Sequence, residues 1–454
     1  MMRSMYSAVS GLRVHQSKMD TIGNNIANVN TVGFKRGQVT FQEVFSQVVR
    51  GASAPQGGKG GTNPQQIGMG VATGSINTIH TKGPGQRTDN PTDLMIDGDG
   101  FFVISSDPNF NNRYYTRAGN FTLDRDGNLV TAEGDKVLGY GVDGEGNITS
   151  DVTNIRINMS ETKAPTATQK IMFKGNLDSR EDVGHKESVD TVIYDSLGNS
   201  YKITFELEKE TTTAPDSAWK YSVKRITDLA TGNYTETDIT DTSAPGSGNL
   251  IFDGKGKLKV DDSIPDAGIN LKINNGIKFT HSKDGTAFTT PIPKSSGEFS
   301  DSISILDKED DLTFKDIHQY ANDMGFKPEG KIGNTSGTIE GFTIDATGTV
   351  VGVFTNGERK ALGQLMLAKF DNPMGLQKLG GNNFIDTRNS GEPQLGKAST
   401  IGLGAISPGN LEMSNVDISL EFTEMITTQR GFQANSRIIT TSDEMLQELV
   451  NMKR

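Results

Sequence analysis

Apolar residues recur at seven-residue intervals at both ends of the chain, and this feature constrains the fold more than any other. Near the N-terminus the first row is Met5, Leu12, Met19 and Ile26, and a second row three residues later is Ala8, His15, Ile22 and Val29. Such spacing is typical of a helix that packs against another helix. His15 is the polar member of these rows, and we interpret it as a packing residue and not as a ligand.

A second helix is predicted at the C-terminus. Its apolar row is long and narrow and consists of Ile418, Met425, Phe432, Ile439 and Leu446. Ser414 followed by Asp417 is a capping-box signal, so the helix is expected to begin there. Lys453 and Arg454 suit the negative end of its dipole. A helix of this extent would be about 54 Å long.

The sequence leaves open what covers these two helices. One interpretation is a pair within the chain, packed on a globular body. The other is that several copies of the chain supply the missing apolar surface, because two helices alone bury a single seam and are marginally stable. In that case residues 1–69 and 415–454 are expected to be disordered in the isolated monomer and to fold on polymerisation.

Between the ends, apolar and polar residues alternate and turn signals are frequent. Hairpin turns are expected at Asp126-Gly127, Glu133-Gly134 and Asp143-Gly144, since Asp-Gly is a strong hairpin signal. One short helix is expected near residues 316–324. The predicted fold class is multidomain and mainly β: antiparallel domains, sandwich-like or barrel-like, lie between N- and C-terminal α-helices that form a coiled-coil-like inner layer.

Changes in composition suggest the domain boundaries. The segment from Gly51 is rich in Gly, Pro and Gln and cannot form a core, and further changes occur at Glu161 and Met324. A chain of 454 residues has room for about three domains. The expected parts are a terminal helical domain (1–30 and 415–454), a connecting segment (31–69), a β body (70–160 and 335–414) and an inserted outer β domain (161–334).

Charge and composition exclude several classes of protein. The net charge of -11 offers no basic field for phosphates or anionic lipids, so no nucleic-acid partner and no direct membrane insertion are expected. The N-terminus lacks the compact apolar region of a cleaved signal peptide. The chain contains no Cys, which excludes disulfide bonds and thiolate metal sites.

No residue pattern points to catalysis. The five His residues are scattered, so we expect no catalytic, cofactor-binding or metal-binding residues. The turn at Asp124 starts like a calcium loop but has Leu129 where Gly is required. The segments 139–144 and 391–398 resemble phosphate-binding patterns, but they lack the neighbouring helix or strand that such a site requires. An adhesin built of β domains would not explain the terminal repeats, and a polysaccharide-degrading enzyme would need a carboxylate pair that the sequence does not single out.

Several segments resemble bacterial flagellar rod and hook proteins. ANVNTVGFKR at 27–36 follows an SAVSGL helix at 7–12. Also similar to that family are LMIDGDGFFVI at 94–104, YTRAGNFTLDRDGNLV at 115–130 and the closing segment from Ser414. FKGNLDS at 173–179, TVIYDSLGNSYKITFEL at 191–207 and the segment 348–384 resemble the branch that builds the hook, whose members carry an insertion that distal rod members lack.

The resemblance implies a structural subunit without enzymatic activity. Copies of it would self-assemble into a flexible tube that transmits torque from the rod to the filament and contains an export channel. The implied location is the extracellular flagellum, reached without a cleaved signal peptide. The implied partners are other copies of the chain, the distal rod protein, the hook cap, the hook–filament junction protein and the type III export apparatus.

The resemblance also assigns roles to particular residues. The turn that ends the first helix contains Asn28, Asn30, Gly33 and Phe34. Phe41 and Phe45 resemble a short export signal, with packing as an equal alternative. The C-terminal helix is implied to be innermost. Its face opposite the apolar row carries no large apolar side chain and is therefore expected to line the channel; the alternative is a solvated face or one paired with acidic residues of a neighbouring copy. The residues of the face expected to line the channel are Thr423, Thr427, Arg430, Ala434, Arg437 and Thr441.

Overall fold

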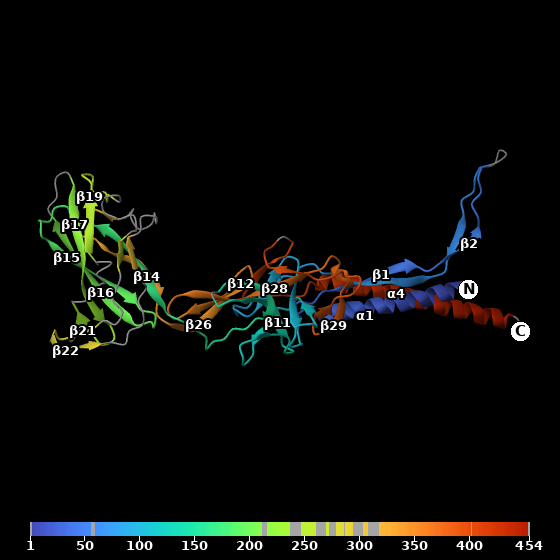
Figure 1. The fold of residues 1–454 in the computed structure, drawn as a ribbon. Coiled ribbons are helices and arrows are strands. Elements are labelled where there is room, and N and C mark those ends of the chain that lie inside the picture. The colour runs from blue at the N-terminus through green and yellow to red at the C-terminus, as the bar shows by residue number, and fades with distance from the viewer. Residues whose placement is uncertain are drawn as a thin grey trace. The chain divides into compact units, whose positions relative to one another are not determined.

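The computed structural model describes residues 2–55, 60–144, 146–210, 216–236, 247–259, 269–271, 278–285, 287–293, 303–306, 317–400 and 402–452. Across these residues the chain is mainly β with one long helix near each terminus, which confirms the predicted fold class (Figure 1). The chain divides into two compact units. Unit 1 comprises Met1–Met159, Gly341–Val353 and Arg359–Arg454, and unit 2 comprises Ser160–Glu340 and Phe354–Glu358.

Both described helices belong to unit 1: α1 (Met2–Ala27) and α4 (Ile418–Asn451). The N-cap of α4 is Asp417, whose carboxylate accepts hydrogen bonds from two backbone N–H groups of the first turn, at 2.8 and 3.2 Å. The predicted start at Ser414 is therefore wrong, because the carboxylate of Asp417 caps the helix directly. The last two residues, expected to complement the helix dipole, lie outside the described residues.

Most strands of unit 1 are short. They are β1 (Gly37–Glu43), β2 (Ser46–Arg50), β3 (Gln65–Gly68), β4 (Val71–Thr78), β5 (Gly85–Arg87), β6 (Leu94–Asp97), β7 (Phe101–Ser105), β8 (Tyr114–Thr116), β9 (Thr122–Leu123), β10 (Leu129–Val130), β11 (Lys136–Val142), β12 (Ile148–Asn154), β28 (Arg359–Lys369), β29 (Gln377–Gly380), β30 (Asn383–Ile385), β31 (Gln394–Lys397), β32 (Ala405–Pro408) and β33 (Asn410–Glu412). A 3-10 turn, η1, spans Pro373–Gly375, and β26 (Gly337–Ile344) and β27 (Thr349–Phe354) contribute residues to both units. The main path of the unit 1 sheet, β27-β28-β11-β7-β8-β30-β29, is antiparallel throughout.

The strand β7 shows why one part of the sequence is continuously apolar. Phe101, Phe102, Val103 and Ile104 are all buried. Because successive side chains of a strand point to opposite faces, Phe102 and Ile104 join one hydrophobic cluster and Phe101 and Val103 join another. The sheet is therefore covered on both faces at β7, and each face gains about 25 cal/mol per Å² of buried apolar surface.

The described strands of unit 2 form two sheets, apart from the first strand, which pairs with β26. The strands of unit 2 are β13 (Thr162–Lys163), β14 (Thr166–Asn176), β15 (Lys186–Tyr194), β16 (Ser200–Glu210), β17 (Ser217–Asp228), β18 (Tyr234–Thr235), β19 (Ser247–Phe252), β20 (Ile269–Leu271), β21 (Lys278–His281), β22 (Ala287–Pro293), β23 (Ile303–Leu306), β24 (Ile317–His318) and β25 (Lys327–Asn334). One sheet has the order β15-β16-β17-β18-β21-β22 with β19 on β17, and the other has the order β20-β23-β14-β24 with β25 on β14. Most pairs are antiparallel, as predicted, but β14 pairs in parallel with β23 and β24.

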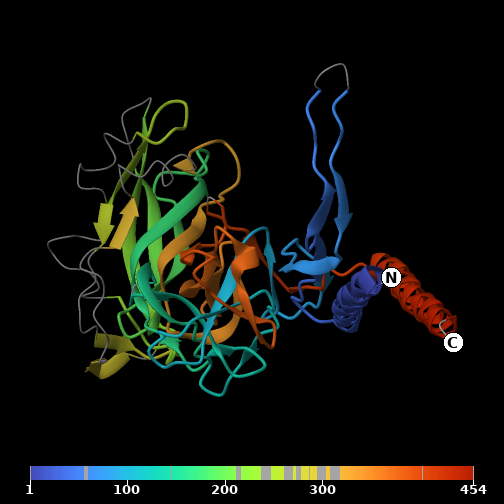
Figure 2. The ribbon, with the colours of Figure 1, turned by 90° about the vertical axis from the view of Figure 1, so that its right-hand side faces the viewer.

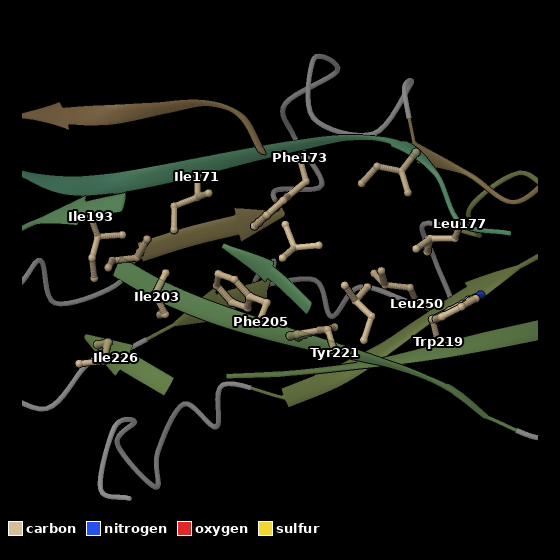
Figure 3. Packing of buried hydrophobic residues seen from close by; sticks show 14 of the residues in the cluster. Ile171, Phe173, Leu177, Ile193, Ile203, Phe205, Trp219, Tyr221, Ile226 and Leu250 are labelled. Carbon is tan, nitrogen blue, oxygen red and sulfur yellow. The ribbon is translucent and has the colours of Figure 1, made fainter. Parts of the chain in front are cut away.

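The core of unit 2 joins residues from both sheets (Figure 3). In β16 every second residue is buried: Tyr201, Ile203, Phe205 and Leu207. The ring of Phe205 meets the ring of Phe173 on β14 edge to face, with centroids 5.4 Å apart. This period of two is the signal by which the sequence predicts a strand with one buried face.

Several tight turns share one hydrogen-bonding pattern. The Asp124 carboxylate accepts from two backbone N–H groups, at 2.9 and 2.7 Å, and from Nδ2 of Asn128 at 2.6 Å. These hydrogen bonds, led by that of Asn128, hold the pKa of Asp124 below its usual value. Gly127 has a φ of 82°, and a Cβ there would lie 2.2 Å from a carbonyl oxygen, so only Gly fits. The calcium-like start at Asp124 is thus a turn, and Asp195 begins another of the same kind.

One predicted turn is displaced along the chain. The turn expected at Asp143-Gly144 has its left-handed residue at Gly146, with a φ of 96°. The Asp143 carboxylate accepts from the backbone N–H of Asn147 at 2.8 Å. Asp143 therefore makes hydrogen bonds like those of Asp124, and the left-handed position is Gly146 and not the predicted Gly144.

The short helix expected near 316–324 is wrong for residues 317–324, which the structure describes. Ile317 belongs to β24, and the following residues are irregular. The side chain of Asn176 explains this: it donates to the carbonyl of Asn322 at 2.8 Å and accepts from the N–H of Tyr320 at 2.7 Å. These hydrogen bonds take the place of those within a helix.

Candidate functional site

The helices α1 and α4 lie side by side and run in opposite directions (Figures 1 and 2). Lys18 on α1 lies 3.0 Å from Glu424, whereas Asn25, later in α1, donates to Glu421, earlier in α4, at 3.2 Å. Most buried residues of the two helices are small or polar: Ala8, Gly11, Val14, Ile22 and Asn25 on α1, and Glu421, Thr428 and Ser442 on α4. The pair therefore meets through a narrow and partly polar seam.

Two glycines let the helices approach closely. A Cβ at Gly11 would lie 2.7 Å from Nδ2 of Asn435, and a Cβ at Gly431 would lie 2.8 Å from Nε2 of His15. We call these two contacts the glycine notches, because in each a larger side chain fills the space above a glycine of the other helix. Burial, and then the nearby charge of Lys18, lowers the pKa of His15, so this ring is neutral at neutral pH.

The residues predicted to pack the helices are mostly half-buried in a single chain. Ile22 is buried and Ile418 is exposed. The others are half-buried: Met5, Leu12, Met19, Ile26, Met425, Phe432, Ile439 and Leu446. The seven-residue rows therefore flank the small and polar contact, and part of their surface faces solvent.

A single copy leaves many other large apolar side chains exposed on both helices. They are Tyr6 and Val9 on α1, and Leu420, Phe422, Ile426, Ile438, Met445, Leu449 and Val450 on α4. At 100° per residue, Leu420, Ile438, Met445 and Leu449 fall on one side of α4. Exposed large apolar side chains that lie close together, as Ile438, Met445 and Leu449 do on this side, mark an interaction site.

The face of α4 predicted to line a channel is also exposed. All six of its residues are exposed: Thr423, Thr427, Arg430, Ala434, Arg437 and Thr441. The three threonine hydroxyl groups donate to carbonyls of their own helix, at 2.8 to 2.9 Å, so they present no free donor. Ile426, one turn before Arg430, is 54% exposed, so this side is not free of large apolar side chains as the sequence suggested.

A polar clamp joins the end of α1 to the start of α4. The side chain of Asn25 makes two hydrogen bonds with the backbone of Gly37, at 2.9 Å each, besides its bond to Glu421. Arg36 lies 3.5 Å from the other oxygen of Glu421, and its N–H donates to Asn415 at 2.8 Å. Because Asn25 and Glu421 are buried, these hydrogen bonds replace those that water would make.

The signature turn follows α1 directly. Asn28 folds back on the helix and donates to a carbonyl one turn earlier, at 2.8 Å. Gly33 has a φ of 70° and donates its N–H to the carbonyl of Glu412 at 2.8 Å. A Cβ on Gly33 would lie 2.6 Å from a backbone nitrogen of unit 1, so the turn packs directly on that backbone. Phe34 is buried, whereas Asn30 is exposed.

Three buried charged side chains meet where this turn contacts the rest of unit 1. Oε1 of Glu412 lies 2.5 Å from Nζ of Lys35, and Oε2 lies 3.2 Å from Nη1 of Arg117. Lys35 and Arg117 also donate to backbone carbonyls, at 2.7 and 2.8 Å, and a backbone N–H donates to Glu412 at 2.9 Å. The side chains of Lys35 and Glu412 have no exposed surface. We call this group the ion cluster.

The ion cluster joins parts of the chain that are far apart in sequence. Lys35 follows α1, Arg117 follows β8, and Glu412 ends β33 shortly before α4. Burial lowers the pKa of both Lys35 and Arg117, and the carboxylate of Glu412 opposes this shift in both. Because two cations share this carboxylate, its loss would leave Lys35 without its partner and Arg117 with only the longer-range attraction of Asp99.

His80 lies beside the ion cluster. Its ring packs against the rings of Phe101 and Phe384, with centroids 5.6 and 5.5 Å away. Burial, and then the charges of Lys35 and Arg117, lower its pKa from 6.5 to about 3. His80 is therefore neutral in the folded chain at any physiological pH, and its protonation would add a further cation to a positively charged region.

The connecting segment takes part in two antiparallel ribbons: β2 pairs with β3 inside it, and β1 pairs with β4, which lies just beyond residue 69 (Figure 2). Phe41 on β1 is 42% exposed and meets the ring of His15 edge-on, with centroids 5.7 Å apart. Phe45 is 64% exposed. The second ribbon exposes Val48, Val49 and Ile67 as well. Both Phe residues are thus accessible in the folded chain, Phe45 more than Phe41.

The described part of the chain contains no group of three side chains that could hold a metal ion. Neither of its helices combines the length and the apolar character that a membrane crossing requires. The glycine patterns at 139–144 and 391–398 overlap strands β11 and β31. Neither pattern opens a helix among the described residues, so neither places a helix N-terminus at a phosphate.

Sequence reasoning did not find the residues that hold this site together. Lys35, Arg117 and Glu412 have no spacing that predicts their contact, because the contact depends on the whole fold. Gly11 and Gly431 could have been found: a glycine inside a helix costs about 1 kcal/mol relative to Ala, so its presence in a packed helix signals a close approach.

Four family models match the chain. The C-terminal region of flagellar basal body rod FlgEFG proteins matches residues 407–452, and the flagellar hook protein FlgE/F/G D1 domain matches residues 95–162. The flagella basal body rod protein family matches residues 5–35, and the flagellar basal body protein FlaE D2 domain matches residues 166–330. Both ends and both units therefore carry matches.

Relatives match over the full length. The chain is 38% identical over 471 residues to the flagellar hook protein FlgE of Borreliella burgdorferi and 35% identical over 475 residues to that of Treponema pallidum. It is also 31% identical over 455 residues to the flagellar basal-body rod protein FlgG of Bacillus subtilis. Each comparison covers 100% of this chain and 100% of the relative.

Replacing Glu412 by Gln should destabilise unit 1 strongly. The amide keeps the shape of the side chain but leaves Lys35 without its carboxylate partner and Arg117 with only the longer-range attraction of Asp99, which costs about 3–5 kcal/mol. Urea denaturation followed by circular dichroism measures this loss in the free energy of unfolding. The control Asp97→Asn breaks the exposed Lys82–Asp97 pair and should cost far less. Equal losses in the two variants would contradict the role of the ion cluster.

The lowered pKa of His80 predicts that the stability of unit 1 depends on pH. The pKa of His80 is 6.5 in the unfolded chain and about 3 in the folded chain, so the unfolded chain binds the proton first as the pH falls. The free energy of unfolding of unit 1 should therefore decrease from pH 6.5 to about pH 3, at most by about 1.4 kcal/mol for each unit of pKa shift. Urea titrations at several pH values should show a flatter slope for His80→Leu; an unchanged slope would assign the effect to another group.

Proposed function

Because the chain belongs to the flagellar hook and rod protein family and is a structural, non-enzymatic subunit of the hook, we propose that its copies form a flexible tube that transmits torque from the rod to the filament. The family implies a polymer within the flagellum. One observation supports the proposal that copies of the chain form a tube. A single copy pairs α1 with α4 through small and polar residues and leaves large apolar side chains exposed.

Other copies of the chain are the proposed cover for this apolar surface. A helix pair with one narrow seam is marginal by itself, so further helix contacts would contribute much of its stability. Contacts between different patches of identical chains extend into an open helical polymer when the rotation between copies does not close a ring. The half-buried rows, from Met5 to Ile26 and from Met425 to Leu446, would then pack between copies.

We propose that α4 lines an export channel on its exposed polar face. The residues concerned are Thr423, Thr427, Arg430, Ala434, Arg437 and Thr441. Their exposure and the internal hydrogen bonds of the threonine hydroxyls support this, since such a wall would offer little for a passing unfolded chain to bind. Ile426 and Met445 would have to pack against neighbouring copies, because both are exposed on or beside the same side.

The proposal assigns a role to each part of the chain. Residues 1–30 and 415–454 form the inner layer, and residues 31–69 pack between neighbouring copies. Residues 70–160 and 335–414 form the body, and residues 161–334 form an outer domain. In this scheme the β parts make smaller and wetter contacts, which can slide as the tube bends, while the interlocked helices resist twist.

Export and partners complete the proposal. The chain would leave the cell through the flagellar type III export apparatus without a cleaved signal peptide, with Phe41 and Phe45 as the export signal. The exposure of both rings supports a recognition role. The proposed partners in the assembled structure are the distal rod protein, the hook cap and the hook–filament junction protein.

The direct test replaces exposed apolar residues of α4. Ile438→Ser together with Leu449→Ser should abolish the tubes seen by electron microscopy of the concentrated protein, because a single copy leaves both side chains uncovered. The control pair Gln433→Ser and Gln447→Ser, at polar positions of the same helix, should leave the tubes intact. Fluorescence of the single Trp219, buried in unit 2, reports that this unit stays folded. Normal tubes from the first variant would refute the proposal.

A further inference from the structure

The apolar rows of α1 and α4 cannot decide by themselves how these helices pair. Residues that recur every seven positions present a similar surface after a shift of seven, so several registers bury comparable apolar area. In the proposed assembly, each α1 meets the α4 of its own chain and the α4 helices of other copies. Another feature must therefore distinguish the correct partner and register.

The glycine notches supply this distinction. In the observed register His15 stands over Gly431, the only glycine of α4. A shift of seven residues in either direction would place Glu424 or Ile438 opposite His15, and their side chains would occupy the space of its ring. At the second notch, Asn435 needs the missing Cβ of Gly11 in the same way. Only one register therefore satisfies both notches.

The polar clamp adds a second requirement. Glu421 is buried and receives a hydrogen bond from the amide of Asn25 at 3.2 Å. In a shifted register this buried carboxylate would lose that donor, which leaves a charged group poorly compensated. Asn25 lies near the end of α1 and Gly11 lies nearer its start, so notch and clamp act at separate points of the seam.

We infer that the two glycine notches and the Asn25–Glu421 hydrogen bond are the specificity determinants of the terminal helices. They pair α1 with the α4 of the same chain in one register and leave the exposed apolar side chains for other copies. The inference rests on the proposed function, because only in the proposed assembly do other copies of the chain compete for α1 and α4.

The chain contains no Cys, so a pair of introduced thiols reports on the pairing in the assembled polymer. Lys18→Cys and Glu424→Cys place one thiol on each helix, where the two native side chains now approach to 3.0 Å. A short bismaleimide joins these thiols within one chain if the pairing is as observed. The product is then a faster-migrating monomer on a denaturing gel, whereas pairing with another copy gives a cross-linked dimer.

In this background Gly431→Ala should lower the intrachain product about five-fold or prevent assembly, because the new Cβ takes the place of the His15 ring. Adding His15→Ala should restore the product and the tubes, since two small side chains fit together. Gly23→Ala is the matched control. Gly23 is also helical, but nothing lies within 4 Å of its Cβ position, so the product should not change.

Three results would overturn the inference. One is an unchanged intrachain product in polymers of the Gly431→Ala variant. Another is a loss that His15→Ala fails to reverse, which would assign the effect to something other than the notch. The third is a predominant dimer product in the parent polymer. These results can be distinguished from a failure of the proposed function. If the proposed function were wrong, the wild-type chain itself would form no tubes.

Discussion

The single carboxylate of Glu412 holds together the point in unit 1 from which both terminal helices extend. It neutralises Lys35 and Arg117 in a place closed to solvent, where an unpaired charge would cost several kcal/mol. The two sides of this junction are not equivalent. If the turn with Lys35 left, Glu412 and Arg117 would still form a pair, whereas departure of the strand with Glu412 would take the carboxylate partner from both cations and leave Arg117 with only the longer-range attraction of Asp99. The C-terminal side is therefore the more firmly anchored.

Beyond the ion cluster, the helices lack an anchor of comparable strength. Their seam within one chain consists of glycine notches, a polar clamp and few buried apolar residues, while large apolar side chains such as Ile438 and Leu449 remain exposed. The seam suits the partner helix of the same chain, and the exposed apolar side chains remain available to further copies of the chain, as expected for a subunit of a flagellar polymer. If the proposed assembly is correct, the ion cluster lies at the limit between the part of unit 1 that would be stable alone and the helices that would depend on neighbouring copies.

The sequence predicted those features whose signal is local. The period of seven predicted both helices, and the alternation in β16 and the Asp-Gly turns predicted the β middle. Features that depend on distant contacts were missed. The start of α4 was placed at Ser414 because the capping signal did not show that Asp417 would bond the first turn itself. The parallel pairs of β14 and the contact of Lys35 with Glu412 have no local pattern, since they join segments far apart in the chain.

Hydrogen exchange of the backbone amides in the monomer and in the polymer tests this account most directly. Strands in the β part of unit 1, such as β7 and β28, should be protected in both states, because many of their side chains are buried within unit 1 itself. The amides of α1 and α4 should exchange quickly in the monomer and become protected only in the polymer. Protection of both helices in the monomer equal to that of β7 would contradict the claim that their stability depends on neighbouring copies.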